Sequence, residues 1–183
     1  MNLLDAILDA RGGGAVRDLS RNFGIEEGQA VSALRQLLPA LSSGLKRNVG
    51  QPEGLESLLG ALKSGNHARY LEDASAIGQP ETVGEGNGIL GHLLGSKDVS
   101  RRVAGRAAEQ TGLPEGLLKK MLPVVATLAM GALSKQTTGR GGLLTRAQEA
   151  PGGNLLNSLG PLLDADGDGS VMDDLFSIAR KLF

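Results

Sequence analysis

The chain has 183 residues and a formal net charge of −1, so it has no overall field that would attract nucleic acid or anionic lipid. It contains no cysteine, which excludes disulfides, thiolate nucleophiles and cysteine-ligated zinc or iron–sulfur sites. Aromatic residues make up only 2%, so the core must consist of Leu, Val and Ala, a composition that favours helix-on-helix packing. We therefore expect an all-α protein.

The first segment is predicted to be an amphipathic helix. Apolar residues recur at helical spacing from Leu3 to Leu8, and the pattern stops at the glycine run that begins at Gly12. Asp5 and Asp9 interrupt the apolar stretch, and no basic segment precedes it. We therefore expect no secretory signal and a cytoplasmic protein.

Two further helices are expected before residue 50. The second runs from Val16 to Phe23 and is closed by Gly24. The third begins after two glutamates that suit the positive end of a helix, and Pro39 predicts a bend or a break within it. Residues 1–50 form the first predicted helical unit.

Residues 51–88 differ in composition from residues 1–50, because short apolar stretches alternate there with glycines and prolines. We interpret them as an irregular connector with little helix, ending in a linker over residues 79–88.

Residues 89–135 repeat the opening pattern. Ile89, Leu90, Leu93 and Leu94 have the same spacing as the apolar residues of the first helix. The segment from Gly112 to Gly116 resembles the segment from Gly24 to Gly28, and a Leu-Pro pair follows each of them. The sequence therefore predicts a multihelical bundle of two quasi-repeated halves.

The longest apolar run, Met121 to Leu133, is shorter than the roughly 20 residues that a membrane-spanning helix needs. We expect it to be a buried central helix and expect no membrane span. Flanking lysines leave a re-entrant or membrane-surface segment as the alternative. Residues 136–163 are rich in glycine and are interpreted as a linker.

Three parts of the second half carry a family resemblance. The run from Gly86 to Val99, the Gly112-Leu113 pair and the segment from Lys119 to Pro123 resemble the YidB-like family of bacterial proteins of unknown function. The similarity extends from the N-terminus to about Lys135. The resemblance implies a multihelical fold and brings no catalytic residue, activity or cofactor.

The clearest chemical pattern lies in the last segment, residues 164–183. Alternate carboxylates, a glycine at the sixth position and a β-branched residue at the eighth match the first two-thirds of an EF-hand calcium loop. The twelfth position is Leu175 instead of the usual bidentate glutamate, so a later aspartate would have to substitute. The predicted Ca²⁺ ligands are Asp164, Asp166, Asp168, Ser170, Asp173 and Asp174. The alternative is a solvated turn whose aspartates cap the final helix.

The final helix is predicted to be amphipathic, with Val171, Leu175, Ile178 and Leu182 on one face. Packing on its own domain is the first interpretation, and docking into a partner is the second.

The segment from Val16 to Ile25, with the helix that follows, resembles a helix-turn-helix unit with Gly24 at its turn. Glu26 and Glu27 at the start of the would-be reading helix would repel DNA phosphates. Around the second copy, cations outnumber acids, which leaves a phosphate-binding face open there. These cations are Lys97, Arg101, Arg102, Arg106, Lys119 and Lys120.

His67 and His92 are the only histidines, and their spacing gives neither a catalytic triad nor a set of metal ligands. Each is expected to make a hydrogen bond in the core or at a helix end, with a catalytic or metal role as the alternative. We therefore expect a non-enzymatic interaction or self-assembly protein that forms a homo-oligomer or binds a protein partner. DNA association through the helix-turn-helix-like units is the alternative function.

Overall fold

The structure is a computed structural model that describes residues 3–64 and 67–138. These residues form eight α-helices and one short 3-10 helix, and no strand occurs among them, which confirms the all-α prediction. In chain order the elements are α1 (Leu3–Asp9), α2 (Gly14–Phe23), α3 (Glu27–Val49), α4 (Pro52–Ser64), α5 (Arg69–Glu72), η1 (Ala74–Ala76), α6 (Pro80–Leu94), α7 (Lys97–Thr111) and α8 (Glu115–Thr138).

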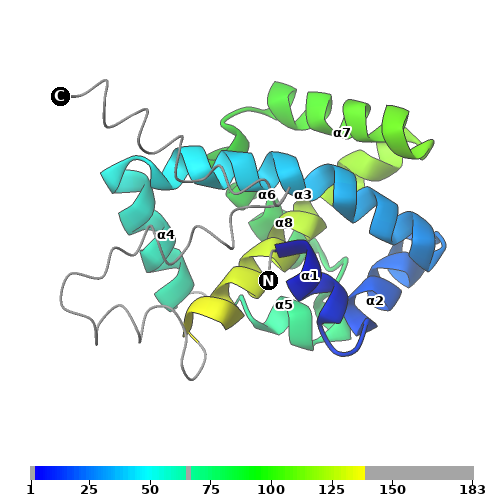
Figure 1. Cartoon of the computed structure of the whole chain (residues 1–183), viewed down its shortest axis with the longest axis horizontal. Coiled ribbons are helices and arrows are strands. Elements are labelled where there is room, and N and C mark those ends of the chain that lie inside the picture. Colours follow the sequence, from blue (N-terminus) through cyan, green and yellow to red (C-terminus); the bar gives the residue numbers. More distant parts are fainter. Residues whose placement is uncertain (1–2, 65–66, 139–183) are drawn as a thin grey trace.

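The core is built around α8, which contacts α1, α3, α4, α5, α6 and α7 (Figure 1). Every Leu, Met, Val and Ala side chain from Met121 to Leu133 is at most 6% exposed, which confirms the predicted buried central helix. The Thr127 side chain within this run is also buried, and its hydroxyl donates a hydrogen bond to the Val124 carbonyl at 2.7 Å. A polar group in the core is thereby satisfied by the helix itself.

The helix α3 lies across α8 and contacts α1, α2, α4, α6, α7 and α8. It begins after Glu26, whose backbone N–H donates to the Gln29 side chain at 3.0 Å. The helix is continuous through Pro39, so the break that the sequence left open does not occur. Buried leucines on both sides of Pro39 hold the two parts of α3 against the rest of the bundle.

The prediction of a helix-poor connector over residues 51–88 was wrong. This stretch contains α4, α5, η1 and the first nine residues of α6, which extends unbroken through the supposed linker over residues 79–88. Pro80 takes the first turn of α6, where its missing N–H has no helical partner to lose. The glycines that follow were interpreted as turn signals, but they lie in a helix that packs on α8, α3 and α7. Tertiary packing has overridden their low helix propensity.

Two equivalent halves are not confirmed. The local signals do recur, since α2 and α7 both end at a left-handed glycine, Gly24 at φ 64° and Gly112 at φ 71°, and α3 and α8 each contain one proline. The packing differs: α7 lies against both α3 and α8, whereas α2 packs mainly on α3 and α1. The quasi-repeat stays a prediction. The predicted linker is also shortened at its start, because α8 runs to Thr138.

Candidate functional site

The predicted calcium loop and the final amphipathic helix lie outside the described residues. This applies to all six expected ligands, Asp164, Asp166, Asp168, Ser170, Asp173 and Asp174. Within residues 3–64 and 67–138, no group of three or more His, Asp or Glu side chains is arranged to hold a metal ion.

The two histidines occupy different elements and different environments. His92 is exposed in the last turn of α6, and its backbone carbonyl accepts a hydrogen bond from the Asn48 side chain at 3.4 Å. His67 lies just before α5, with its ring centroid 6.2 Å from that of Tyr70. Its Nδ1 atom is buried and has no hydrogen-bond partner in the described part of the chain. The structure does not bring the two imidazoles into one site.

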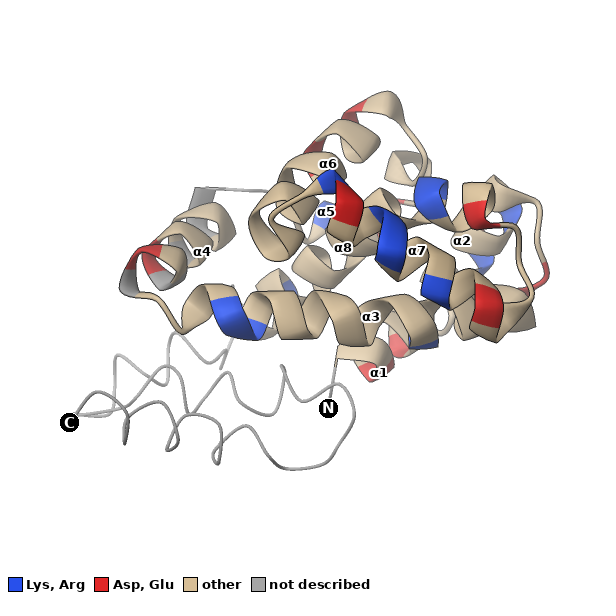
Figure 2. Ribbon diagram, turned by 90° about the horizontal axis from the view of Figure 1, so that it is seen from above, with Lys and Arg blue, Asp and Glu red and all other residues tan. Residues whose placement is uncertain are grey.

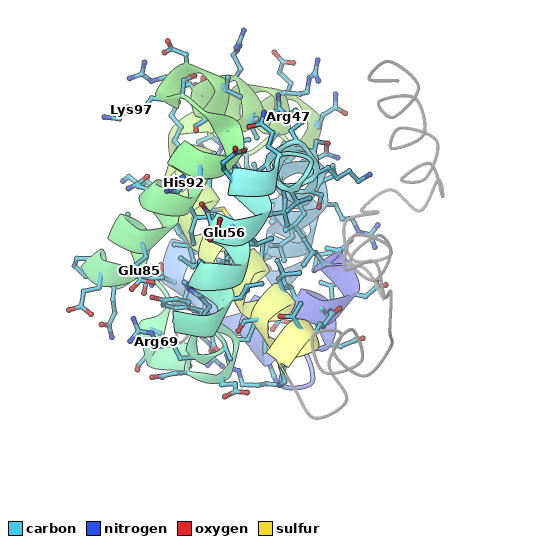
Figure 3. The ribbon with its side chains drawn as sticks, turned by 90° about the vertical axis from the view of Figure 1, so that its left-hand side faces the viewer. Arg47, Glu56, Arg69, Glu85, His92 and Lys97 are labelled. Atoms are coloured by element: carbon cyan, nitrogen blue, oxygen red, sulfur yellow. The ribbon has the colours of Figure 1, made fainter. Side chains whose placement is uncertain are left out.

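A polar cluster that sequence reasoning missed joins α5 to α6. The Tyr70 hydroxyl donates to the Glu85 carboxylate, and the Arg69 guanidinium donates to the Tyr70 oxygen at 2.8 Å and approaches Glu85 at 3.4 Å. Figure 3 shows Arg69 and Glu85 next to each other, at the opposite end of α6 from His92. The partners are 15 residues apart, in a stretch that was interpreted as irregular, so no sequence signal linked them.

The hydrogen bonds of this cluster indicate a structural clamp between α5 and α6. Burial raises the pKa of the Tyr70 hydroxyl, the hydrogen bond to Glu85 raises it further, and the hydrogen bond from Arg69 opposes the rise. The hydrogen bond with Tyr70 in turn raises the pKa of Arg69. Tyr70 therefore remains protonated at neutral pH, so it donates a hydrogen bond and does not act as a base.

The helix α6 has glycines on two opposite faces, an inner face toward α8 and an outer face toward solvent. On the inner face, a Cβ added to Gly86 would overlap the backbone carbonyl of Pro123 in α8, so only glycine allows the two helices to approach this closely. On the outer face, Gly84, Gly88 and Gly91 recur at helical spacing, and Gly95 continues the line as the left-handed C-cap at φ 76°. These four are exposed, and an added Cβ would meet nothing within 4 Å.

A cavity of about 650 Å³ lies between the end of α6, the start of α7 and the first half of α8. Its wall includes Gly91 and Gly95, and its floor includes apolar side chains of α6 and α8. Three cationic side chains line it: Lys97, Arg101 and Lys119. The turn into α7 is fixed by Ser96, whose hydroxyl accepts the Val99 N–H at 3.2 Å and caps the helix. The cations were singled out in the sequence, but the cavity was not.

The six cations near the second predicted helix-turn-helix are all exposed. Figure 2 shows the basic positions of α7 following one another along the helix, with acidic positions near both ends. The helix that would read DNA in this copy is α8, and it is buried from Met121 to Ser134. In the first copy, α3 contacts six other helices, and its exposed face begins with Glu26 and Glu27, which would repel phosphates. The burial of α8 keeps it from entering a groove, and the acidic start of α3 disfavours DNA there.

The residues from Glu115 to Thr137 are long and apolar enough to cross a membrane, with a mean hydropathy of 1.4. In the structure, 78% of this apolar window is buried within the protein. Length and composition alone do not separate a membrane span from the core helix of a soluble domain. The burial favours the core helix, and the absence of a membrane span stays a prediction.

These features define a helical domain that is built around one buried central helix and carries a cation-lined cavity at its surface. The chain belongs to a family described as bacterial protein of unknown function (DUF937), whose profile matches residues 5–136. The match covers most of the chain and ends close to the limit of the resemblance to the YidB-like family, with which it is consistent. A search of curated proteins gave no match, and a search of solved structures gave none either.

Proposed function

We propose that this domain is a non-enzymatic binding domain that associates with a second copy of itself through the outer face of α6. The observation that supports the proposal is the line of open glycines, Gly84, Gly88 and Gly91. The described residues, 3–64 and 67–138, give no packing reason for them, because a Cβ at any of the three would meet none of their atoms within 4 Å.

A glycine inside a helix is less stable than alanine by roughly 0.5–1 kcal/mol, because the unfolded glycine has more backbone freedom to lose. Three such positions in one helix lower the stability by about 1.5–3 kcal/mol, a large part of the roughly 5–15 kcal/mol that holds a typical domain together. A contact with another backbone would offset this cost, since glycine is the residue that lets two backbones approach most closely.

A second copy of the chain is the partner that this face suits best. The net charge of −1 gives little repulsion between two copies. Val83 and Ile89 are partly buried against the core, and the exposed side chains nearest the glycine line are polar, so close backbone contact along the glycines would hold the two copies together. A two-fold pairing would place the same face on both subunits, which is the usual arrangement in homodimers.

The test is the solution mass by light scattering at two concentrations of the full chain. We expect the unsubstituted protein to gain mass with concentration, and Gly84→Ala and Gly88→Ala to remain monomeric at the higher one. Gly105→Ala is the matched control, because Gly105 is interior to α7 and an added Cβ would meet only the Glu115 side chain at 3.9 Å. A monomer at both concentrations, or equal association of all four proteins, would remove the proposal.

DNA association is the second candidate, and the six exposed cations of α7 and α8 favour it. Because α8 is buried from Met121 to Ser134 and α3 begins with two glutamates, binding would be to phosphates and independent of base sequence. Its affinity would then fall steeply as salt concentration rises, whereas apolar self-association would change far less. Titration of a fluorescent DNA duplex at 50 and 200 mM salt separates the two.

Calcium binding by the C-terminal aspartates is a separate proposal that the sequence pattern alone supports. Isothermal titration with calcium should give saturable heat that Asp164→Ala and Asp168→Ala each remove, because each variant deletes a carboxylate ligand. Absence of heat above dilution at millimolar calcium would show that the aspartates form only a solvated turn.

A further inference from the structure

The cavity between α6, α7 and α8 has the size and lining of a small-ligand site. Its volume of about 650 Å³ lies within the range of roughly 300–1,000 Å³ that is usual for such sites. The floor consists of Leu90, Leu122 and Pro123, with the two leucines at most 5% exposed. The rim is polar and basic, so the site combines an apolar surface with a charged edge.

The charges of the rim favour an anion. Arg101 pairs with Asp98 at 3.0 Å, and Lys119 pairs with Glu115 at 2.5 Å. Lys97 makes no ion pair within the part of the chain that the structure describes. The three cations therefore exceed the two acids that pair with them by one charge.

The two existing ion pairs do not prevent an anion from binding. In the Arg101–Asp98 pair the side chains are 63% and 80% exposed, and in the Lys119–Glu115 pair they are 44% and 49% exposed. Ion pairs at such solvated positions contribute little to stability, so their cations are free to turn toward a ligand of higher charge. A phosphate group has a charge of about −1.5 to −2 at neutral pH and three acceptor oxygens, one for each of the three cations.

The wall of the cavity exposes helix backbone as well as side chains. An added Cβ at Gly91 or Gly95 would meet nothing within 4 Å, so a ligand can reach the backbone there without a steric barrier. Asn87, one turn before Gly91, places an exposed side-chain amide at the same wall. Amide N–H groups are donors that suit phosphate oxygens, each of which can accept more than one hydrogen bond.

We propose that this cavity binds a phosphate monoester. The phosphate lies at the rim formed by Lys97, Arg101 and Lys119, and the organic group covers the apolar floor. This inference goes beyond self-association through α6, since it depends on α7 and α8 cations and shares only Gly91 with the glycine line. The same chemistry is found in a soluble phosphate ester and in the headgroup of phosphatidic acid, and the experiment separates these two sources.

The experiment titrates the ¹⁵N-labelled full chain with phenyl phosphate, inorganic phosphate and phenol, and follows amide chemical shifts. We expect saturable shifts with phenyl phosphate around Gly91 and Ser96, at least about tenfold weaker binding of inorganic phosphate, and no binding of phenol. Lys97→Ala should weaken binding of phenyl phosphate roughly tenfold, and Lys97→Arg should keep most of it. Unchanged thermal unfolding of Lys97→Ala would show that the loss is local.

Lys120→Ala and Arg102→Ala are the matched controls, because both side chains are exposed neighbours that do not line the cavity. They should bind as the unsubstituted protein does. Equal weakening by the control and Lys97 variants, equal binding of phenyl phosphate and inorganic phosphate, or no shifts at millimolar ligand would each overturn the proposal. Co-sedimentation with phosphatidic acid vesicles that Lys97→Ala abolishes would assign the lipid headgroup as the source. Binding of phenyl phosphate without co-sedimentation would assign a soluble ester.

Discussion

The inner and outer faces of α6 both contain glycine, but for opposite physical reasons. On the inner face, Gly86 is required, because α8 passes so close that the Pro123 carbonyl occupies the place of a side chain. On the outer face, a Cβ at Gly84 or Gly88 would meet nothing within 4 Å, and no contact in the part of the chain that the structure describes requires these glycines. A glycine within a helix therefore does not indicate one structural role. Its effect on stability is set by what its missing Cβ would meet.

The largest expected effect comes from filling the inner face. Gly86→Ala should lower the free energy of unfolding by about 1–3 kcal/mol, because the new methyl group forces α6 and α8 apart across a buried contact. Urea denaturation followed by circular dichroism measures the change. A variant as stable as the unsubstituted protein would show that the two helices are not in close contact, and the distinction between the two faces would be lost.

A smaller effect of opposite sign is expected on the outer face. Gly84→Ala and Gly88→Ala should each raise the free energy of unfolding by about 0.5–1 kcal/mol, since alanine restricts the unfolded chain and meets no obstacle in the folded one. The measurement has to be made at low protein concentration, where any self-association does not add to stability. Destabilisation by either substitution would mean that the outer face is packed within the chain.

This contrast explains which parts of the fold the sequence was able to predict. The central helix was predictable because the apolar run from Met121 to Leu133 can be shielded from water only in the core. The ends of α2 and α7 were marked by Gly24 and Gly112, which adopt the left-handed conformation that glycine favours. The glycines of α6 were misinterpreted as turns, because the Pro123 backbone that gives Gly86 its role is distant in sequence.

The candidate sites show the same limit. The cations at the rim of the cavity were recognised as an excess of positive charge, because Lys97, Arg101 and Lys119 lie in or beside two predicted helices. The cavity itself requires α6 to lie beside α7 and α8, and α6 was predicted only from residue 89 onward. The contact between Tyr70 and Glu85 was missed for the same reason, since a residue in a supposed linker has no predicted position in space.

The smallest expected effect concerns the side of α6 between these two faces, where Glu85 accepts the hydrogen bond of Tyr70. Tyr70 is the only tyrosine and the chain has no tryptophan, so ultraviolet absorbance of tyrosinate reports on this one hydroxyl. Burial raises its pKa in the folded protein, so we expect a titration midpoint above the usual value of about 10. Since the folded pKa exceeds the unfolded one, the contribution to stability is complete below the unfolded pKa and is lost as pH rises through the folded one.

Two substitutions should move this midpoint in opposite directions. Glu85→Gln should lower it, because the carboxylate and its hydrogen bond both favour the protonated hydroxyl, and Arg69→Ala should raise it, because the guanidinium favours the tyrosinate. Glu81→Gln is the control for a general change of charge on α6, since Glu81 is exposed, is not among the groups that shift the pKa of Tyr70, and is the weakest of those that raise the pKa of Arg69. If both cluster variants shifted the midpoint in the same direction, a change in burial would be the common cause, and the clamp between α5 and α6 would not exist as described.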